Sequence, residues 1–125
     1  MQPNPKIFRA YDIRGVAERD LPPDVVENIA HAIAAQLKES GATNVAVGRD
    51  VRPSSPRIAK ILTDVFEGAG FEVIDIGVAA TPMLYYAVSK FKLGGGVIVT
   101  ASHNPGPDNG MKILRGDVAL SGNEI

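Results

Sequence analysis

Cysteine is absent from the 125 residues, so neither a disulfide framework nor a thiolate metal site is possible. An excess of one charge is also lacking, because 13 basic and 14 acidic side chains give a formal net charge of −1. We therefore expect no nucleic-acid or membrane partner, and any anion must bind locally. No apolar run approaches the roughly 20 residues of a membrane helix, and the N-terminus lacks a signal pattern. These absences predict a soluble, cytoplasmic domain.

Common nucleotide and metal motifs are missing as well. The sequence has no GxxxxGK[ST] phosphate loop and no HExxH metal motif, and it contains only two histidines. The three glycines at 94–96 precede an apolar run instead of following it, which excludes a dinucleotide-binding turn at that place.

Three segments have the three- and four-residue apolar spacing of amphipathic helices. The apolar positions are Val25, Val26, Ile29, Ala30, Ile33 and Leu37 in the first, Ile58, Ile61, Leu62, Val65 and Phe66 in the second, and Leu84, Val88 and Phe91 in the third. Ser54 or Ser55 can cap the second helix. The third opens at Thr81 and Pro82.

Short β-branched runs at 45–48, 73–77 and 96–100 alternate with these helices and read as strands buried on both faces. The runs at 111–114 and 118–120 predict a hairpin, and residues 13–16 can add another strand. Right-handed crossovers then give a three-layer α/β/α domain with a mostly parallel mixed sheet and a C-terminal hairpin.

Two polar stretches follow strands of this sheet: GRDVRPSS (48–55) and TASHNP (100–105). Ligands of open α/β sheets bind beyond the carboxyl ends of the strands, and parallel neighbours end at the same edge. We therefore expect both stretches at one rim.

Each polar residue of TASHNP also has a plain structural reading. Ser102 is a turn or cap residue, or a nucleophile that needs a neighbouring base or cation. His103 follows Ser102 directly, but neighbours in an extended segment point apart, so its role stays open. Asn104 and Asn109 each precede a turn-forming residue, and turn geometry alone can explain both.

The basic residues near the rim leave similar alternatives. Arg49 and Arg52 flank Asp50, which fits either a surface ion pair or a guanidinium braced toward an anion. Arg14 precedes Gly15, where the backbone can approach another segment closely. Lys112 points away from its apolar neighbours, toward solvent or toward a phosphate.

Taken together, four stretches resemble the α-D-phosphohexomutases, in the phosphomannomutase/phosphoglucomutase branch. They are FRAYDIRG, GRDVRPSS, TASHNP and DNGMKI, in this order. The phosphoglucosamine mutase branch, the alternative within the family, usually reads more like GTDGIRG in the first stretch. The resemblance covers essentially all of residues 1–125, but only the first of the family's four domains.

The resemblance implies an isomerase that moves phosphate between C1 and C6 of a hexose. Ser102 would carry the phosphoryl group and exchange it with the sugar through a hexose 1,6-bisphosphate. Mg²⁺ would bind the phosphoserine, with Ser102 as its only link to this chain. Arg14 and Lys112 would lie beside the phosphate, with Lys112 able to carry a proton. His103 belongs to the same catalytic motif.

Five further residues are implied as phosphate-binding or loop-shaping residues: Tyr11, Arg49, Asp50, Asn104 and Asn109. The aspartate-rich metal loop of the family belongs to its second domain and is absent from this sequence. We therefore expect a domain that needs the remaining domains of the same enzyme and has little activity alone.

The end of the sequence reads like the opening of a helix, because Ser121 and Glu124 have capping-box spacing. We expect a cut from a longer protein, with Leu120 and Ile125 poorly covered and the domain able to self-associate. A flavodoxin-like anion-binding module without chemistry, or an interaction domain, are the alternatives to a phosphosugar enzyme.

Overall fold

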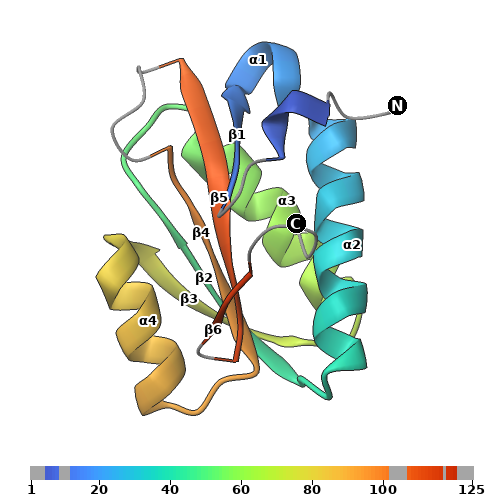
Figure 1. Cartoon of the computed structure of the whole chain (residues 1–125), viewed down its shortest axis with the longest axis vertical. Helices are drawn as coiled ribbons and strands as arrows, with labels where there is room; N and C mark the ends of the chain where they lie inside the picture. Colours follow the sequence, from blue (N-terminus) through green and yellow to red (C-terminus); the bar gives the residue numbers. More distant parts are fainter. Residues whose placement is uncertain (1–4, 9–11, 102–106, 117, 121–125) are drawn as a thin grey trace.

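The chain forms a six-stranded mixed sheet with helices on both faces, as the computed structural model shows (Figure 1). The structure describes residues 5–8, 12–101, 107–116 and 118–120. The strands are β1 (Ile13–Val16), β2 (Asn44–Arg49), β3 (Glu72–Val78), β4 (Gly95–Val99), β5 (Asp108–Arg115) and β6 (Val118–Ala119). The helices are the 3-10 turn η1 (Pro5–Ile7), α1 (Ala17–Asp20), α2 (Pro23–Glu39), α3 (Ser55–Gly68) and α4 (Thr81–Lys90). The three expected helices and the expected strands are confirmed.

The sheet has a parallel part and an antiparallel part. Its order is β1-β5-β4-β2-β3, and β6 pairs with β5. Strand β2 runs parallel to β3 and β4, whereas β5 is antiparallel to β1, β4 and β6. The mixed sheet and the hairpin agree with the expected architecture, and the parallel part comprises β4, β2 and β3. Strand β5 thus returns from the carboxyl end of β4, and it lies between β1 and the parallel strands.

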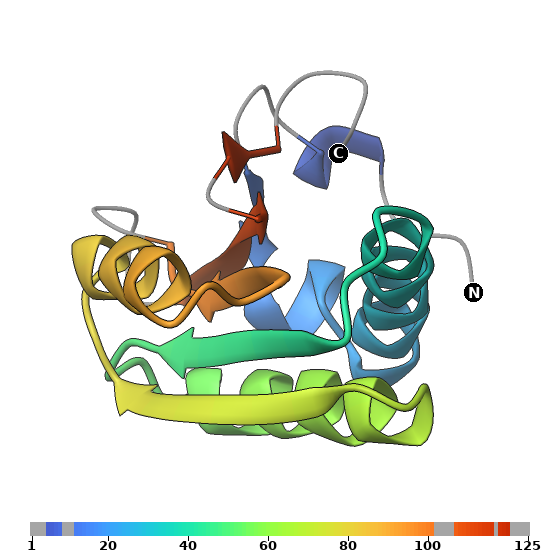
Figure 2. The same cartoon turned by 90° about the horizontal axis from the view of Figure 1, so that it is seen from below.

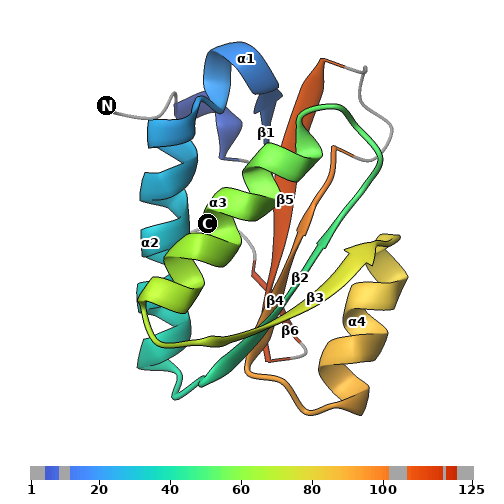
Figure 3. The ribbon, with the colours of Figure 1, turned by 180° about the vertical axis from the view of Figure 1, so that it is seen from behind.

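Helices α2 and α3 cover one face of the sheet, and α4 covers the other, as the view from below shows (Figure 2). The view from behind shows α3 crossing the strands beside α2 (Figure 3). The larger core lies between the sheet and α2 and α3, with Val45, Val47, Val97 and Val99 on the strand side. A smaller core lies under α4. This confirms the three-layer α/β/α architecture.

Two expectations about apolar residues were wrong. Phe91 does not belong to the buried face of α4, since its side chain is 62% exposed. The helix ends at Lys90, so the helical spacing no longer applies to Phe91, and Leu93 is buried in its place.

Leu120 is the second correction, because it is only 2% exposed. Its backbone amide donates to the Ile113 carbonyl oxygen at 2.9 Å, which continues the β5–β6 hairpin, and its side chain joins the larger core. Ile125, the other residue expected to be poorly covered, lies outside the described residues. Within the ranges given above, no helix is both long enough and apolar enough to cross a membrane.

Candidate active site

The segment after β2 and the described start of TASHNP, Thr100 and Ala101, meet at one edge of the sheet. Strands β2 and β4 are parallel neighbours, so their carboxyl ends lie together. Directly beyond these ends, the Asp50 backbone amide donates to the Val99 carbonyl oxygen at 3.0 Å. The segment that follows β2 is therefore hydrogen-bonded to the end of β4, one residue before Thr100.

Arg14 and Lys112 share one face of the sheet near this edge. Arg14 is paired with Gly110 across β1 and β5, and Lys112 lies two residues further along β5. Because side chains alternate along a strand, both point to the face of Gly110. Lys112 is also paired with Ile98, whose side chain packs under α4. The guanidinium and the ammonium group therefore lie on the α4 side, as a diagonal cross-strand pair with Cα atoms about 7–8 Å apart.

Thr100 completes a row with these cations. Its backbone amide donates to the Gly110 carbonyl oxygen at 2.9 Å, so Thr100, directly after β4, stands beside Gly110 on β5, which stands beside Arg14 on β1. Neighbouring strands are about 4.8 Å apart, which puts Arg14 about 10 Å from the start of TASHNP. Gly110, in the middle of the row, adds no side chain over the sheet.

Asp12 braces Arg14. Its carboxylate accepts a hydrogen bond from Arg14 Nε at 2.5 Å, and it is almost completely buried. Residues 12 and 14 are two apart on an extended segment, so their side chains lie on the same face. The pair fixes the direction of the guanidinium and partly balances its charge, and the Arg14 side chain is 19% exposed.

Gly15 allows the last residue of α1 to pack closely against β1. A Cβ atom at this position would lie 2.7 Å from Asp20 Cβ, closer than such atoms approach in proteins. Asp20 Oδ2 in turn accepts a hydrogen bond from the Val16 amide at 2.9 Å. Arg57 on α3 donates to the carbonyl oxygens of Leu21 (2.8 Å) and Ala17 (3.0 Å). The close approach expected at Gly15 is thus confirmed, and it anchors the strand that carries Arg14.

A network that we call the polar bracket, made of Asp50, Arg52, Ser54, Ser55 and Asn109, joins the segment after β2 to β5. The Arg52 backbone amide and Nε both donate to the Asp50 carboxylate at 3.1 Å, and Arg52 Nη1 donates to the Asp108 carbonyl oxygen at 3.2 Å. The Ser55 hydroxyl donates to the same Asp50 carboxylate.

Asn109 closes the bracket from the other side. Its Nδ2 donates to the hydroxyl oxygens of Ser54 (2.7 Å) and Ser55 (2.9 Å), and its Oδ1 accepts from the Gly110 amide at 2.8 Å. Asn109 and Ser55 are fully buried. The cap that we expected from Ser54 or Ser55 is not formed, because neither hydroxyl bonds to an amide of α3. Both hydroxyls bond to bracket side chains instead.

The environment of Asp50 favours its ionised form. Burial raises the pKa of this carboxyl group, but the hydrogen bond from the Ser55 hydroxyl and those from the Arg52 amide and the Thr100 side chain lower it. The positive charge of Arg52 acts in the same direction, and the pKa lies below its ordinary value of 3.8. At neutral pH the bracket therefore contains a carboxylate.

The remaining candidate residues are Arg49 and four residues that the structure does not describe. Ser102, His103, Asn104 and Tyr11 lie outside the described residues, so no geometry is given for them. Arg49 is paired with Val99, which faces α2 and α3, so its side chain is on the opposite face of the sheet from Arg14. There it lines a groove between β2 and α3, together with Lys60, Thr63 and Asp75.

Sequence reasoning missed Asp12 and the structural role of Arg52, Ser54 and Ser55. The alternation of Asp12 with Arg14 is a signal that could have paired them. Nothing in the local sequence ties Arg52 or the two serines to β5, because their partners are more than 50 positions away. That part of the network required the register of the sheet.

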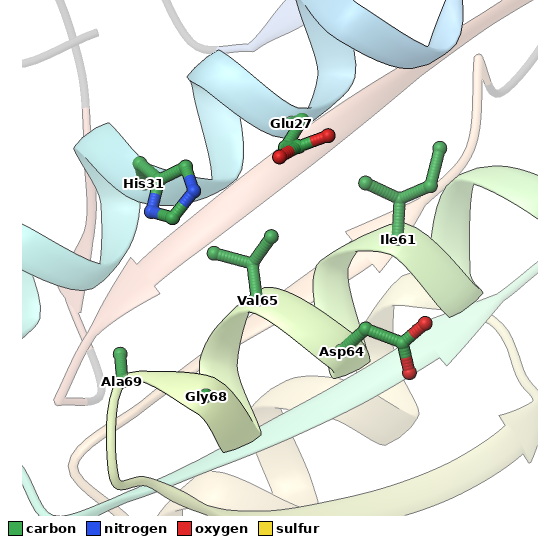
Figure 4. Close-up of a pocket in the computed structure, with 7 residues that line it drawn as sticks. All are labelled: Glu27, His31, Ile61, Asp64, Val65, Gly68 and Ala69. Carbon is green, nitrogen blue, oxygen red and sulfur yellow. The ribbon is translucent and has the colours of Figure 1, made fainter.

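A second hollow lies between α2 and α3, away from the sheet edge. It is lined by Glu27 and His31 of α2 and by Asp64 and Val65 of α3, among others (Figure 4). Asp64 accepts a hydrogen bond from Lys60 at 2.8 Å. Across the part of the chain that the structure describes, no three acidic or histidine side chains gather as metal ligands. This hollow is therefore not a complete metal site.

The fold and the rim define a class: an α/β/α domain that places two cations on one sheet face beside the strand end leading to Ser102. Comparison with known proteins agrees. Residues 5–124 match the profile of "phosphoglucomutase/phosphomannomutase, alpha/beta/alpha domain I". The chain belongs to this family.

Individual relatives are similar over nearly the whole chain. A phosphoglucomutase of Neisseria meningitidis is 43% identical over 119 residues, which are 95% of this chain and 26% of that protein. A phosphomannomutase/phosphoglucomutase of Pseudomonas putida is 42% identical over the same length. A crystal structure of a family protein from Burkholderia thailandensis superposes with a TM-score of 0.92 at 34% identity, covering 98% of this chain and 29% of that one. The chain thus spans about a quarter of the length of the curated relatives it matches.

Proposed function

We propose that this chain is the phosphoserine-bearing domain of a longer phosphohexomutase that interconverts hexose 1-phosphates and hexose 6-phosphates. The observation that supports this most is the row of Thr100, Gly110 and Arg14 with Lys112 beside it. Phosphoryl transfer needs positioning and positive charge more than covalent help from the protein. Two cations at the strand end that leads to Ser102 supply both.

In the proposed reaction, the bond between phosphorus and Ser102 Oγ breaks as phosphorus bonds to O6 of a hexose 1-phosphate. The O6 hydroxyl loses its proton in this step, Ser102 Oγ takes up a proton as it leaves phosphorus, and a hexose 1,6-bisphosphate forms. After the bisphosphate turns round, the phosphoryl group on O1 moves to Ser102 Oγ, which loses its proton, and O1 takes up a proton. Lys112 is the proposed proton carrier in both steps: its ammonium group gives a proton to the leaving oxygen and takes one from the attacking hydroxyl.

Arg14 has a separate task in this proposal. Its guanidinium is aimed by Asp12, so it can bind phosphoryl oxygens with two of its N–H groups. The buried Asp12 carboxylate fixes this direction before the substrate arrives, which reduces the cost of ordering the side chain.

Mg²⁺ belongs to the proposal as the ion that neutralises charge on the phosphoserine. The described residues form no cluster of three acidic or histidine ligands, and the proposal links the ion to this chain through the phosphate of Ser102. The remaining ligands would come from outside the chain. For the same reason, we propose that the chain alone has little mutase activity, and a coupled assay with glucose 1-phosphate tests this.

The test of the proposed function uses the whole protein. We expect incubation with glucose 1,6-bisphosphate and Mg²⁺ to add one phosphoryl group in intact-mass measurements, and Ser102→Ala to abolish the addition. Ser89→Ala, at an exposed serine of α4, is the matched control and should leave the addition unchanged. Phosphate binding without a covalent adduct would instead indicate an anion-binding module.

A further inference from the structure

We propose that Arg52 and Asn109 are positioning residues that hold the ends of β4 and β5 at a fixed separation. In this role, which rests on the proposed function, they place Arg14 and Lys112 relative to the segment that carries Ser102. Neither residue needs to touch the substrate. The polar bracket would act as a clamp that holds the end of β4 and the start of β5.

The clamp holds the end of β4 through Asp50. The Asp50 amide donates to the Val99 carbonyl oxygen, and the Asp50 carboxylate also accepts a hydrogen bond from the Thr100 side chain. Arg52 binds the same carboxylate through its amide and Nε, so Asp50 cannot rotate away without breaking several bonds. The first residue of TASHNP is thereby tied to the segment after β2.

The clamp holds the start of β5 at two points. Arg52 Nη1 reaches the Asp108 carbonyl oxygen, and Asn109 Nδ2 reaches both serine hydroxyls at the start of α3. The Gly110 amide donates to Asn109 Oδ1, which fixes which end of the amide group faces the serines. The hydrogen-bond chain therefore has a defined direction, from Asn109 through Ser55 to Asp50.

Through the pairing of β5 with β1, the clamp also influences where Arg14 lies. Asp108, Asn109 and Gly110 are paired in register with Val16, Gly15 and Arg14 on β1. A shift of the start of β5 would therefore move Arg14 with it. A displacement of about 1 Å in a catalytic group can cost about a hundredfold in rate, so a clamp at this place matters for chemistry.

Burial and charge argue that Arg52 positions and does not bind substrate. Its side chain is only 12% exposed, and its guanidinium is engaged by the Asp50 carboxylate and the Asp108 carbonyl oxygen. Lysine cannot reproduce this arrangement, because a single ammonium group lacks the planar fork that reaches two acceptors at once.

The first experiment measures amide hydrogen exchange by NMR on the chain itself. Arg52→Ala and Asn109→Ser should each speed exchange of the Thr100 and Asp50 amides by about tenfold or more, since each removes bonds that hold these strand ends. Arg57→Ala is the matched control, because it removes two arginine-to-carbonyl bonds elsewhere on α3. It should speed exchange at Leu21 and leave Thr100 and Asp50 within about twofold.

The second experiment measures steady-state kinetics of the whole protein. Arg52→Lys and Asn109→Ser should lower kcat about tenfold or more and leave KM for glucose 1-phosphate within about threefold, because they disturb the placement of reacting groups more than ground-state binding. If Arg52→Ala does not fold, Arg52→Lys also serves in the exchange experiment. A KM effect without a kcat effect would make Arg52 a substrate-binding residue and overturn the proposal.

The two experiments separate failure of the clamp from failure of the proposed function. Unchanged Thr100 and Asp50 exchange in the bracket variants would overturn the clamp, whatever the activity. If wild-type protein lacks mutase turnover, the proposed function fails, and the exchange arm still decides whether the strand ends are clamped. Equal losses of kcat in Arg52→Lys and in Lys60→Ala, which removes an exposed ion pair of α3, would show a general stability effect and would also overturn the clamp.

Discussion

Gly110 offers a sharp test of how tightly β5 is paired with β1. A Cβ atom at this position would lie 2.0 Å from the Ile13 carbonyl oxygen and 3.1 Å from Arg14 Cα. Both are backbone atoms of the neighbouring strand, so no side chain can rotate to make room. Gly110→Ala therefore requires β1 to move away from β5 at Arg14.

The loss of stability depends on whether the atoms that the new Cβ meets can move aside. Overpacking typically costs about 1–3 kcal/mol and occasionally more. In Gly110→Ala the new Cβ overlaps with backbone atoms, which cannot rotate aside, so we expect the free energy of unfolding to fall by about 3 kcal/mol or more. Gly96→Ala gives an intermediate case, because its Cβ would meet the Leu84 and Val88 methyl groups at 2.8 and 3.0 Å, and side chains can partly adjust.

Gly68→Ala is the matched control. Its Cβ would meet nothing within 4 Å, and it lies at the last residue of α3, where alanine favours the helix by about 0.5–1 kcal/mol. Urea denaturation of the three variants should rank Gly68→Ala as the most stable, then Gly96→Ala, then Gly110→Ala. A Gly110→Ala variant within about 0.5 kcal/mol of wild type would refute the strand pairing on which the position of Arg14 depends.

Three further predictions concern stability. Because the pKa of Asp50 in the folded chain lies below 3.8, its contribution to stability is present above that pH and is lost as the pH falls through the folded-state pKa. In urea unfolding between pH 5 and 2, the free energy of unfolding of Asp50→Asn should therefore depend less on pH than that of wild type. An equal dependence in both proteins would contradict the shift. Arg57→Ala should lower the free energy of unfolding by about 1–3 kcal/mol, measured by urea denaturation, through loss of its two bonds to carbonyl oxygens. Leu120→Ala should cost about 2–5 kcal/mol in thermal or urea unfolding, since the side chain is 2% exposed, and a neutral result would show that the hairpin end is not packed.

The sequence predicted the helices and strands well because their signals are local. Apolar spacing marked α2 and α3, and β-branched runs marked β2 and β4. The shared rim also followed from a general rule, that parallel neighbours end at one edge. The error at Phe91 arose because apolar spacing continued one residue past the end of α4.

Contacts between distant segments could not be predicted in the same way. Leu120 was predicted to be poorly covered because the core that it joins is built from α2, α3 and strands that come earlier in the chain. The bracket was hidden for the same reason, since Asn109 and Ser55 are 54 positions apart. Ser54 and Ser55 fitted a local cap rule, but bonds to a buried side chain replaced the cap.

The most direct test of the proposed phosphate site is ³¹P NMR of the whole protein phosphorylated at Ser102, without metal. Phosphoserine ordinarily loses its second proton near pH 6. If Arg14 and Lys112 lie beside the phosphate, its pKa should fall below that value in wild type and rise again in Arg14→Ala and Lys112→Ala. A wild-type pKa near 6 that neither substitution changes would contradict the placement of these cations around the phosphoserine.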